Sequence, residues 1–169
     1  MINKMKKAIG ALVLLSLPYT AWSANPESVT VNVTFVDAIT MSTANHLNFG
    51  LVDSAMAASE TIMISPDDTV TDTNNRRLGG IAEAAEVTVS ASAGQAITIS
   101  VDNIVGGVHY NLGSPTCKYD VNTSVACTSY STTSVASGAL LIGMTLTRNS
   151  VAMTPGVDNG SFEVNVTYN

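Results

Sequence analysis

The chain has 169 residues, of which 46% are hydrophobic and 12% are charged, and its formal net charge at pH 7 is −6. Only seven basic residues accompany thirteen acidic ones, which excludes the basic patches that bind nucleic acid or anionic lipid. The length suits a single domain with a sizeable core.

The first residues predict an export signal. Three lysines precede the apolar run 8–17, and Ala21-Trp22-Ser23 suits cleavage after Ser23. The run is shorter than the roughly 20 residues that span a bilayer, and no later segment resembles a membrane span. We therefore expect residues 1–23 to be a signal peptide and 24–169 to be one exported domain. Cleavage would leave four basic residues against thirteen acidic ones, a net charge of −9.

Short alternating segments separated by turn residues predict an all-β antiparallel sandwich. The candidate strands are 29–36, 47–52, 60–65, 86–91, 96–101, 108–112, 138–148 and 162–168. Ser92-Ala93-Gly94 predicts a hairpin, because glycine accepts a positive φ angle in a short link. The polar stretch 67–80 predicts an exposed loop, and 81–85 predicts one helical turn or a loop.

The chain has two cysteines, Cys117 and Cys127. An exported chain meets an oxidising compartment, which favours a disulfide that staples the polar segment between them. Two free thiols, or a bridge to another chain, remain the alternatives. Neither cysteine has a CxxC partner or a nearby histidine, so we expect no zinc site.

Few residues offer catalytic or metal chemistry. His46 and His109 lie beside apolar segments, and the chain has no GxSxG setting for a serine and no glycine-rich phosphate cradle. Asp67, Asp68 and Asp72 share one segment, but their spacing matches no calcium-binding frame, so a solvated loop is the favoured interpretation. We expect no enzymatic activity, no metal and no cofactor.

Two strongly alternating segments lie at opposite ends of the chain. The apolar positions near the N-terminus are Val29, Val31, Val33 and Phe35. Those at the C-terminus are Phe162, Val164, Val166 and Tyr168. Alternation predicts a buried face without specifying whose core buries it. Either both strands pack in one closed sandwich, or the N-terminal strand fills a groove in another copy by β-strand addition.

Several stretches taken together resemble a group of secreted bacterial domains related to spore coat protein U and to the subunits of chaperone–usher pili. These stretches are VTVNVTFVDAIT, LNFGLV, EVTVSASAGQAITISV and the closing TPG to GSFEVNVTYN. The likeness runs from about residue 29 to residue 169, and Gly156 and the penultimate Tyr168 fit the pilin pattern. It implies an incomplete or nearly incomplete immunoglobulin-like (pilin-like) sandwich, exported through the periplasm of a Gram-negative cell to the cell surface or beyond.

The resemblance also implies partners and roles. Copies of the chain or related subunits, a periplasmic chaperone and an outer-membrane usher would be the partners. The four alternating N-terminal residues would form a donor strand, and the four C-terminal ones, with Gly156, would form the acceptor and chaperone-contact strand. Classical pilins commonly place a cysteine where this chain has Ile39, so the pair of cysteines here departs from their pattern.

The expected function is an exported structural subunit of a bacterial surface fibre or coat, assembled by β-strand addition. The alternative is a self-complete secreted binding module or adhesin. In that case the loops 67–80 or 117–127 would touch a glycan or a protein, and Tyr119 would be available to stack on a sugar.

Overall fold

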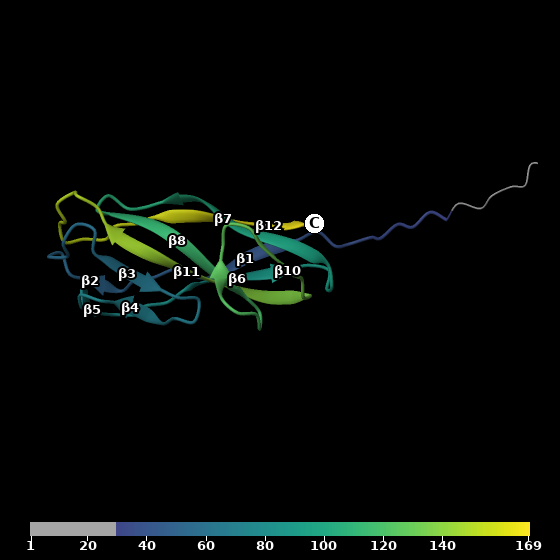
Figure 1. Cartoon of the computed structure of the whole chain (residues 1–169), viewed down its shortest axis with the longest axis horizontal. Helices are drawn as coiled ribbons and strands as arrows, with labels where there is room; N and C mark the ends of the chain where they lie inside the picture. The colour runs from purple at the N-terminus through teal and green to yellow at the C-terminus, as the bar shows by residue number, and fades with distance from the viewer. Residues whose placement is uncertain (1–29) are drawn as a thin grey trace, which may run out of the picture. The chain divides into compact units, whose positions relative to one another are not determined.

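The computed structural model describes residues 30–169, within which Phe35–Asn169 forms one compact unit. This described part contains strands and no helix, in agreement with the predicted all-β class (Figure 1). The strands are β1 (Thr40–Asn45), β2 (Leu51–Val52), β3 (Thr61–Ile64), β4 (Val70–Asp72), β5 (Arg77–Gly79), β6 (Ala85–Ser90), β7 (Ala96–Val105), β8 (Tyr110–Tyr119), β9 (Val125–Ala126), β10 (Tyr130–Thr133), β11 (Ser137–Arg148) and β12 (Ser161–Tyr168). No helix in the described residues is long and apolar enough to cross a membrane.

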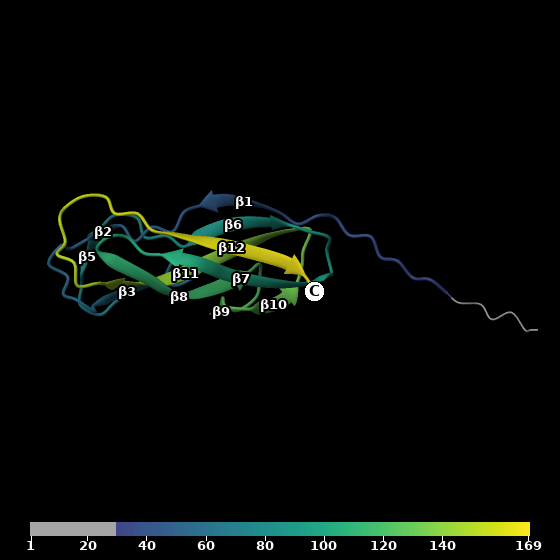
Figure 2. The ribbon, with the colours of Figure 1, turned by 90° about the horizontal axis from the view of Figure 1, so that it is seen from above.

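The strands form an antiparallel sandwich. The larger sheet has the order β1-β6-β11-β3-β4, with β8 on the other edge of β11 and β9 beside β8. The smaller sheet has the order β10-β7-β12, and Figure 2 shows β12 running along β7. The short strands β2 and β5 form a separate pair. β12 and β1 are therefore both edge strands, one in each sheet.

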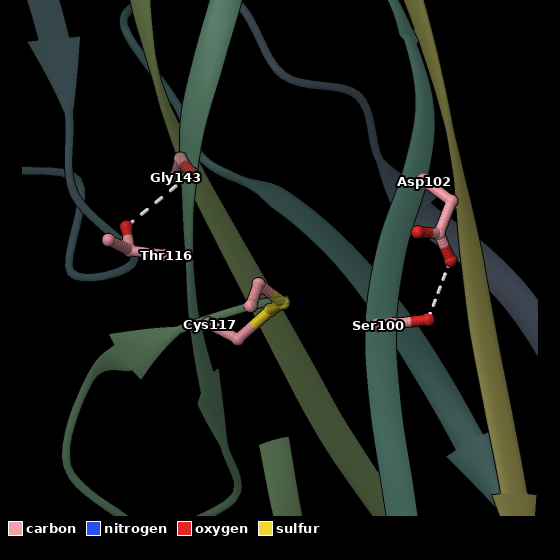
Figure 3. Close-up of a disulfide and its surroundings, with 6 residues drawn as sticks. Ser100, Asp102, Thr116, Cys117 and Gly143 are labelled. Atoms are coloured by element: carbon pink, nitrogen blue, oxygen red, sulfur yellow. Dashed lines mark hydrogen bonds between the residues drawn. A yellow bond between two sulfur atoms is a disulfide. The ribbon is translucent and has the colours of Figure 1, made fainter. Parts of the chain in front are cut away.

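The core lies between the two sheets. It is built from side chains that alternate along the strands, which is what buries one face of each sheet. The fully buried members include Val89, Ile97, Ile99, Cys117, Tyr119, Leu140, Ile142 and Met144. The predicted disulfide between Cys117 and Cys127 is present, with a Cα–Cα distance of 5.2 Å, and both sulfur-bearing side chains are buried (Figure 3).

The long strand β11 changes its neighbour at Gly143. Residues on one side of this glycine pair with β6, and residues on the other side pair with β3. A Cβ atom at Gly143 would lie 2.2 Å from the carbonyl oxygen of Ile64, so the end of β3 can approach β11 only because the side chain is absent. On the opposite edge, the Thr116 hydroxyl donates to the Gly143 carbonyl at 3.4 Å (Figure 3).

The predicted hairpin at Ser92-Ala93-Gly94 is wrong. β6 pairs with β1 and β11, whereas β7 pairs with β10 and β12, so the link crosses from one sheet to the other. The predicted glycine conformation is present, since Gly94 has a φ angle of 79°. The strands on either side do not pair because both are apolar on one face, and the sandwich buries these faces against each other.

Several strand boundaries differ from the predictions. The stretch 67–80 is not a simple loop but holds β4 and β5, two three-residue strands at sheet edges that contain no fully buried side chain. Strands β1, β9 and β10 were not predicted, and 81–85 forms no helical turn. Residues 30–36 form no strand, although 29–36 was predicted as one. The predicted signal peptide and Val29 lie outside the described residues.

Candidate strand-binding groove

The C-terminal strand β12 has one unpaired edge. It pairs antiparallel with β7, and no other strand among residues 30–169 pairs with it. Within the same described part of the chain, the edge strand β1 pairs only with β6. An unpaired edge presents backbone N–H and C=O groups that can accept another strand. The gap between β12 and β1 is therefore a place where a strand can be added.

The apolar face of β12 is only partly covered. Its inward side chains are half-buried, and they are Phe162, Val164, Val166 and Tyr168. The matching side chains of β7, Ile97 and Ile99, are fully buried. The difference has a simple cause: β7 has a neighbour on both edges, whereas β12 has a neighbour on one edge within residues 30–169. The sandwich thus leaves apolar surface of its last strand in contact with solvent.

A groove of about 1280 Å³ runs between the two edge strands. Met41 and Thr43 of β1 line one side, Phe162 and Val164 of β12 line the other, and β6 contributes Ala85 and Val87 between them. Toward the start of β12 the groove continues over further apolar side chains, namely Leu47, Phe49, Tyr110, Leu112 and Met153. These apolar side chains share the lining with polar ones, among them Asn45, His46, Asp53 and Arg148.

Asp158 fixes the loop that closes the groove near the start of β12. Its carboxylate accepts hydrogen bonds from the backbone N–H groups of Val108 and His109, each at 2.8 Å, and lies 2.8 Å from Nδ1 of His109. Burial acts to raise the pKa of Asp158, but the two backbone hydrogen bonds and the His109 ring outweigh it, so the pKa is below its usual value. The carboxylate is therefore held in its charged form.

Tyr110 is a second perturbed group in the groove. Burial raises the pKa of its phenol, the charge of Asp158 adds to the rise, and a hydrogen bond with the Gly160 backbone opposes it. The phenol also donates to the backbone carbonyl of Asp158 at 3.2 Å. The Tyr110 shift thus comes chiefly from burial, and the Asp158 shift from the hydrogen bonds that anchor the loop.

The other end of the groove is tied to the entry of the chain into β1. The Tyr168 hydroxyl accepts a hydrogen bond from the backbone N–H of Ser92 at 2.8 Å and donates to the backbone carbonyl of Asp37 at 2.9 Å. The Ser92 hydroxyl accepts a hydrogen bond from the Asp37 N–H at 2.7 Å. The backbone at Asp37 is thus fixed beside the last residue of β12.

Only some of the predicted acceptor residues line the groove, and these are Gly156, Phe162 and Val164. All four apolar side chains of β12 pack against the main core, Val166 and Tyr168 without lining the groove. In the predicted donor segment, Val31, Val33 and Phe35 are exposed, Phe35 by 91%, and none lies in a strand. The donor role of these residues and of Val29 stays a prediction.

The loops 67–80 and 117–127, which the sequence suggested as binding loops, offer less support for a binding site than the groove does. Asp67 pairs with Lys118, Asp68 accepts a hydrogen bond from the Ala84 N–H, and Asp72 accepts one from the Arg77 N–H. Within residues 30–169, no three His, Cys, Asp or Glu side chains are grouped to hold a metal ion. Tyr119 is fully buried, so the suggestion that it stacks on a sugar is wrong.

Sequence reasoning missed one whole side of the groove. β1 was not predicted, because its sequence TMSTAN alternates weakly and all but the last of its residues are exposed. The anchoring of Asp37 was missed too, since nothing in the sequence links it to a residue 131 positions later. The alternation of β12 was the one signal that pointed to this place.

The comparisons with known proteins define a family. No curated protein and no solved structure is similar enough to the chain to count as a match. A family model does match, over residues 39–168, which covers β1 to β12 and both sides of the groove but not the predicted donor segment. The chain therefore belongs to the DUF4402 family, a domain of unknown function.

Proposed function

We propose that this chain is an exported structural subunit of a bacterial surface fibre or coat, assembled by β-strand addition into the groove between β1 and β12. The observation that carries the proposal is the coincidence of an unpaired strand edge with half-buried apolar side chains along the same strand. A strand placed there would gain backbone hydrogen bonds from β12 and would bury those side chains. The backbone hydrogen bonds or the apolar burial alone would support strand addition less strongly.

The chain itself carries a segment with the right pattern. Val29, Val31, Val33 and Phe35 alternate with Ser28, Thr30, Asn32 and Thr34. An added strand needs one apolar face for the groove and one polar face for solvent, and this segment provides both. The exposure of Val31, Val33 and Phe35 means that burial of these side chains is still to be gained.

A donor strand that runs antiparallel to β12 has to come from a second copy. Tyr168 lies opposite Ile97 and Ser161 opposite Val105, so β12 runs toward the end where Asp37 is anchored. A strand antiparallel to β12 would finish at the Ser161 end, roughly 26 Å away for eight residues. One residue, Val36, would have to span that length in cis, whereas a residue spans at most about 3.6 Å. Only a strand parallel to β12 could come from the same copy.

The remaining parts of the proposal follow from the resemblance described above. Export would take the chain to the periplasm, where a chaperone would cover the open edge of β12 before assembly, and an outer-membrane usher would be the site of assembly. A strand supplied by a chaperone would meet the same apolar lining, chiefly Phe162 and Val164. The proposal includes no enzymatic step.

The experiment compares the exported chain with a form lacking residues 24–36. Sedimentation velocity measures the size of each, and a synthetic peptide of residues 28–36 is added to the shortened form. We expect the full form to associate and the shortened form to remain folded and monomeric. We also expect the peptide to bind the shortened form and to raise its melting temperature, because a ligand that binds only the folded state stabilises it.

Two double variants of the peptide test which face of the added strand is bound, the first on the inward face and the second, as its matched control, on the outward face. Val31→Asn with Val33→Asn removes apolar side chains from the inward face and should abolish binding. Thr30→Asn with Thr34→Asn changes the outward face and should leave binding within about twofold, since that face remains in solvent. A full-length monomer that unfolds when residues 24–36 are removed would contradict the proposal and would support a self-complete secreted module instead.

A further inference from the structure

Exposed apolar side chains gather at one end of the Phe35–Asn169 unit. Figures 1 and 2 show β2, β5 and the loop before β12 at the end opposite the C-terminus, and we call this the distal end. Its exposed apolar side chains include Leu51 of β2, Leu78 of β5, Val157 of that loop, Ile81 just after β5, and Val108, whose backbone N–H donates to Asp158 of the same loop. Leu51, Leu78 and Val157 also line the groove where it opens at this end. The apolar surface is thus continuous with the groove.

At the opposite end of the unit, the N-terminal segment joins the folded part of the chain. Asp37 is fixed there by Tyr168 and Ser92. Only Val36 separates this anchored residue from Phe35, the last inward position of the predicted donor strand. A copy that donates this strand therefore has no slack between the donor and its own folded unit.

The register of the added strand determines where the folded unit of the donor copy lies on the recipient copy. Both alternating segments have four apolar positions, and one antiparallel register pairs all of them across the strands. It sets Val29 opposite Tyr168 and Phe35 opposite Phe162. Phe35 then lies beside Phe162, which lines the groove at the start of β12 and packs against the same core cluster as Leu112.

We infer that the distal end of one copy is a docking surface for the Asp37 end of the copy that donates its strand. This inference rests on the proposed function. With Phe35 seated beside Phe162, Asp37 of the donor follows after one residue, so the donor's folded unit would lie against the part of the recipient beyond the start of β12, which holds β2, β5 and the loop before β12 (Figures 1 and 2). The exposed apolar side chains there would be buried by this contact. Because the two surfaces differ, the contact is head-to-tail and can continue from copy to copy without closing.

The experiment separates the docking surface from the groove. Ile81 is 70% exposed and Val108 is 66% exposed, and neither lines the groove. We would make Ile81→Ser with Val108→Ser in the full exported chain, and Met63→Ser as the matched control. Met63 is an exposed apolar side chain of β3 that does not line the groove. Self-association is measured by sedimentation, and binding of the peptide of residues 28–36 by calorimetry on the same variants lacking residues 24–36.

The two measurements have distinct outcomes. We expect the double variant to weaken association of the full chain by about tenfold or more, as truncating buried interface side chains does, with peptide affinity unchanged. The control should change neither value. Unchanged association of the double variant, with the peptide still bound, would overturn the docking surface alone. Absence of peptide binding to every form would refute strand addition, and the docking surface with it.

Discussion

The hydroxyl of Tyr168 donates a hydrogen bond to the backbone carbonyl of Asp37 at 2.9 Å, which joins the last strand to the point where the chain enters the first. The same hydroxyl accepts from the Ser92 N–H, so one side chain ties three segments together. Tyr168 stood out in the sequence as the final apolar position of an alternating strand. The structure adds that its polar end fixes the base of the predicted donor segment.

Replacing Tyr168 with Phe should lower the free energy of unfolding by about 1–2 kcal/mol. The change removes both hydrogen bonds and leaves the Ser92 N–H and the Asp37 carbonyl to find water. Urea denaturation of the purified domain measures the loss. Tyr130→Phe is the control, because the described residues provide no hydrogen-bond partner for the Tyr130 hydroxyl; an equal effect of the two changes would contradict the role given to Tyr168.

Asp158→Asn should destabilise the domain most strongly near neutral pH. The pKa of Asp158 is lowered in the folded state, so its stabilising effect is present above the unfolded-state pKa near 4 and is lost as the pH falls through the folded-state value. The gap between the melting temperatures of the two proteins should therefore shrink progressively below about pH 4. Thermal melts from pH 2 to pH 7 measure this gap. A constant gap across that range would show that the charge of Asp158 is not responsible, and Asp120→Asn, in an exposed loop, should give no gap at either extreme.

Gly143 of β11 and Gly113 of β8 lie on neighbouring strands and provide a matched pair of substitutions. A Cβ atom at Gly143 would lie 2.2 Å from the Ile64 carbonyl oxygen, whereas one at Gly113 would meet nothing within 4 Å. Gly143→Ala should cost about 2–4 kcal/mol, because backbone must shift to admit it. Gly113→Ala should change stability by less than about 1 kcal/mol. Chemical denaturation of both variants tests the difference, which vanishes if β3 can move away from β11 at little cost.

Loss of the disulfide should weaken the domain without changing its fold. Replacing Cys117 and Cys127 together with Ala should lower the free energy of unfolding by about 2–3 kcal/mol, given the short loop that the bridge closes. Both cysteines are fully buried, so the native protein should also resist mild reductants until it unfolds. Denaturation curves measure the first effect, and thiol titration of the native protein under reducing conditions measures the second. Rapid reduction of the native protein would contradict the buried location.

The sequence by itself determined which residues are apolar on one face and where the bridge lies. A period of two predicted strands close to β3, β6, β7, β11 and β12, and two cysteines in an exported chain predicted the disulfide. These features were predictable because alternation and pairing chemistry are local properties of the chain. Short polar strands such as β4 and β10 carry no such signal, because an edge strand can be stable with few buried side chains.

Only the tertiary structure decided which strands are neighbours. Alternation specifies the face that a strand buries and is silent about the strand that receives its backbone hydrogen bonds. For that reason β6 and β7 were predicted as a hairpin and are found in opposite sheets, and the unpaired edge of β12 could not be known before β1 was located across the groove. The C-terminal strand GSFEVNVTYN could be predicted from its alternating sequence alone, but its unpaired edge is a property of the whole fold.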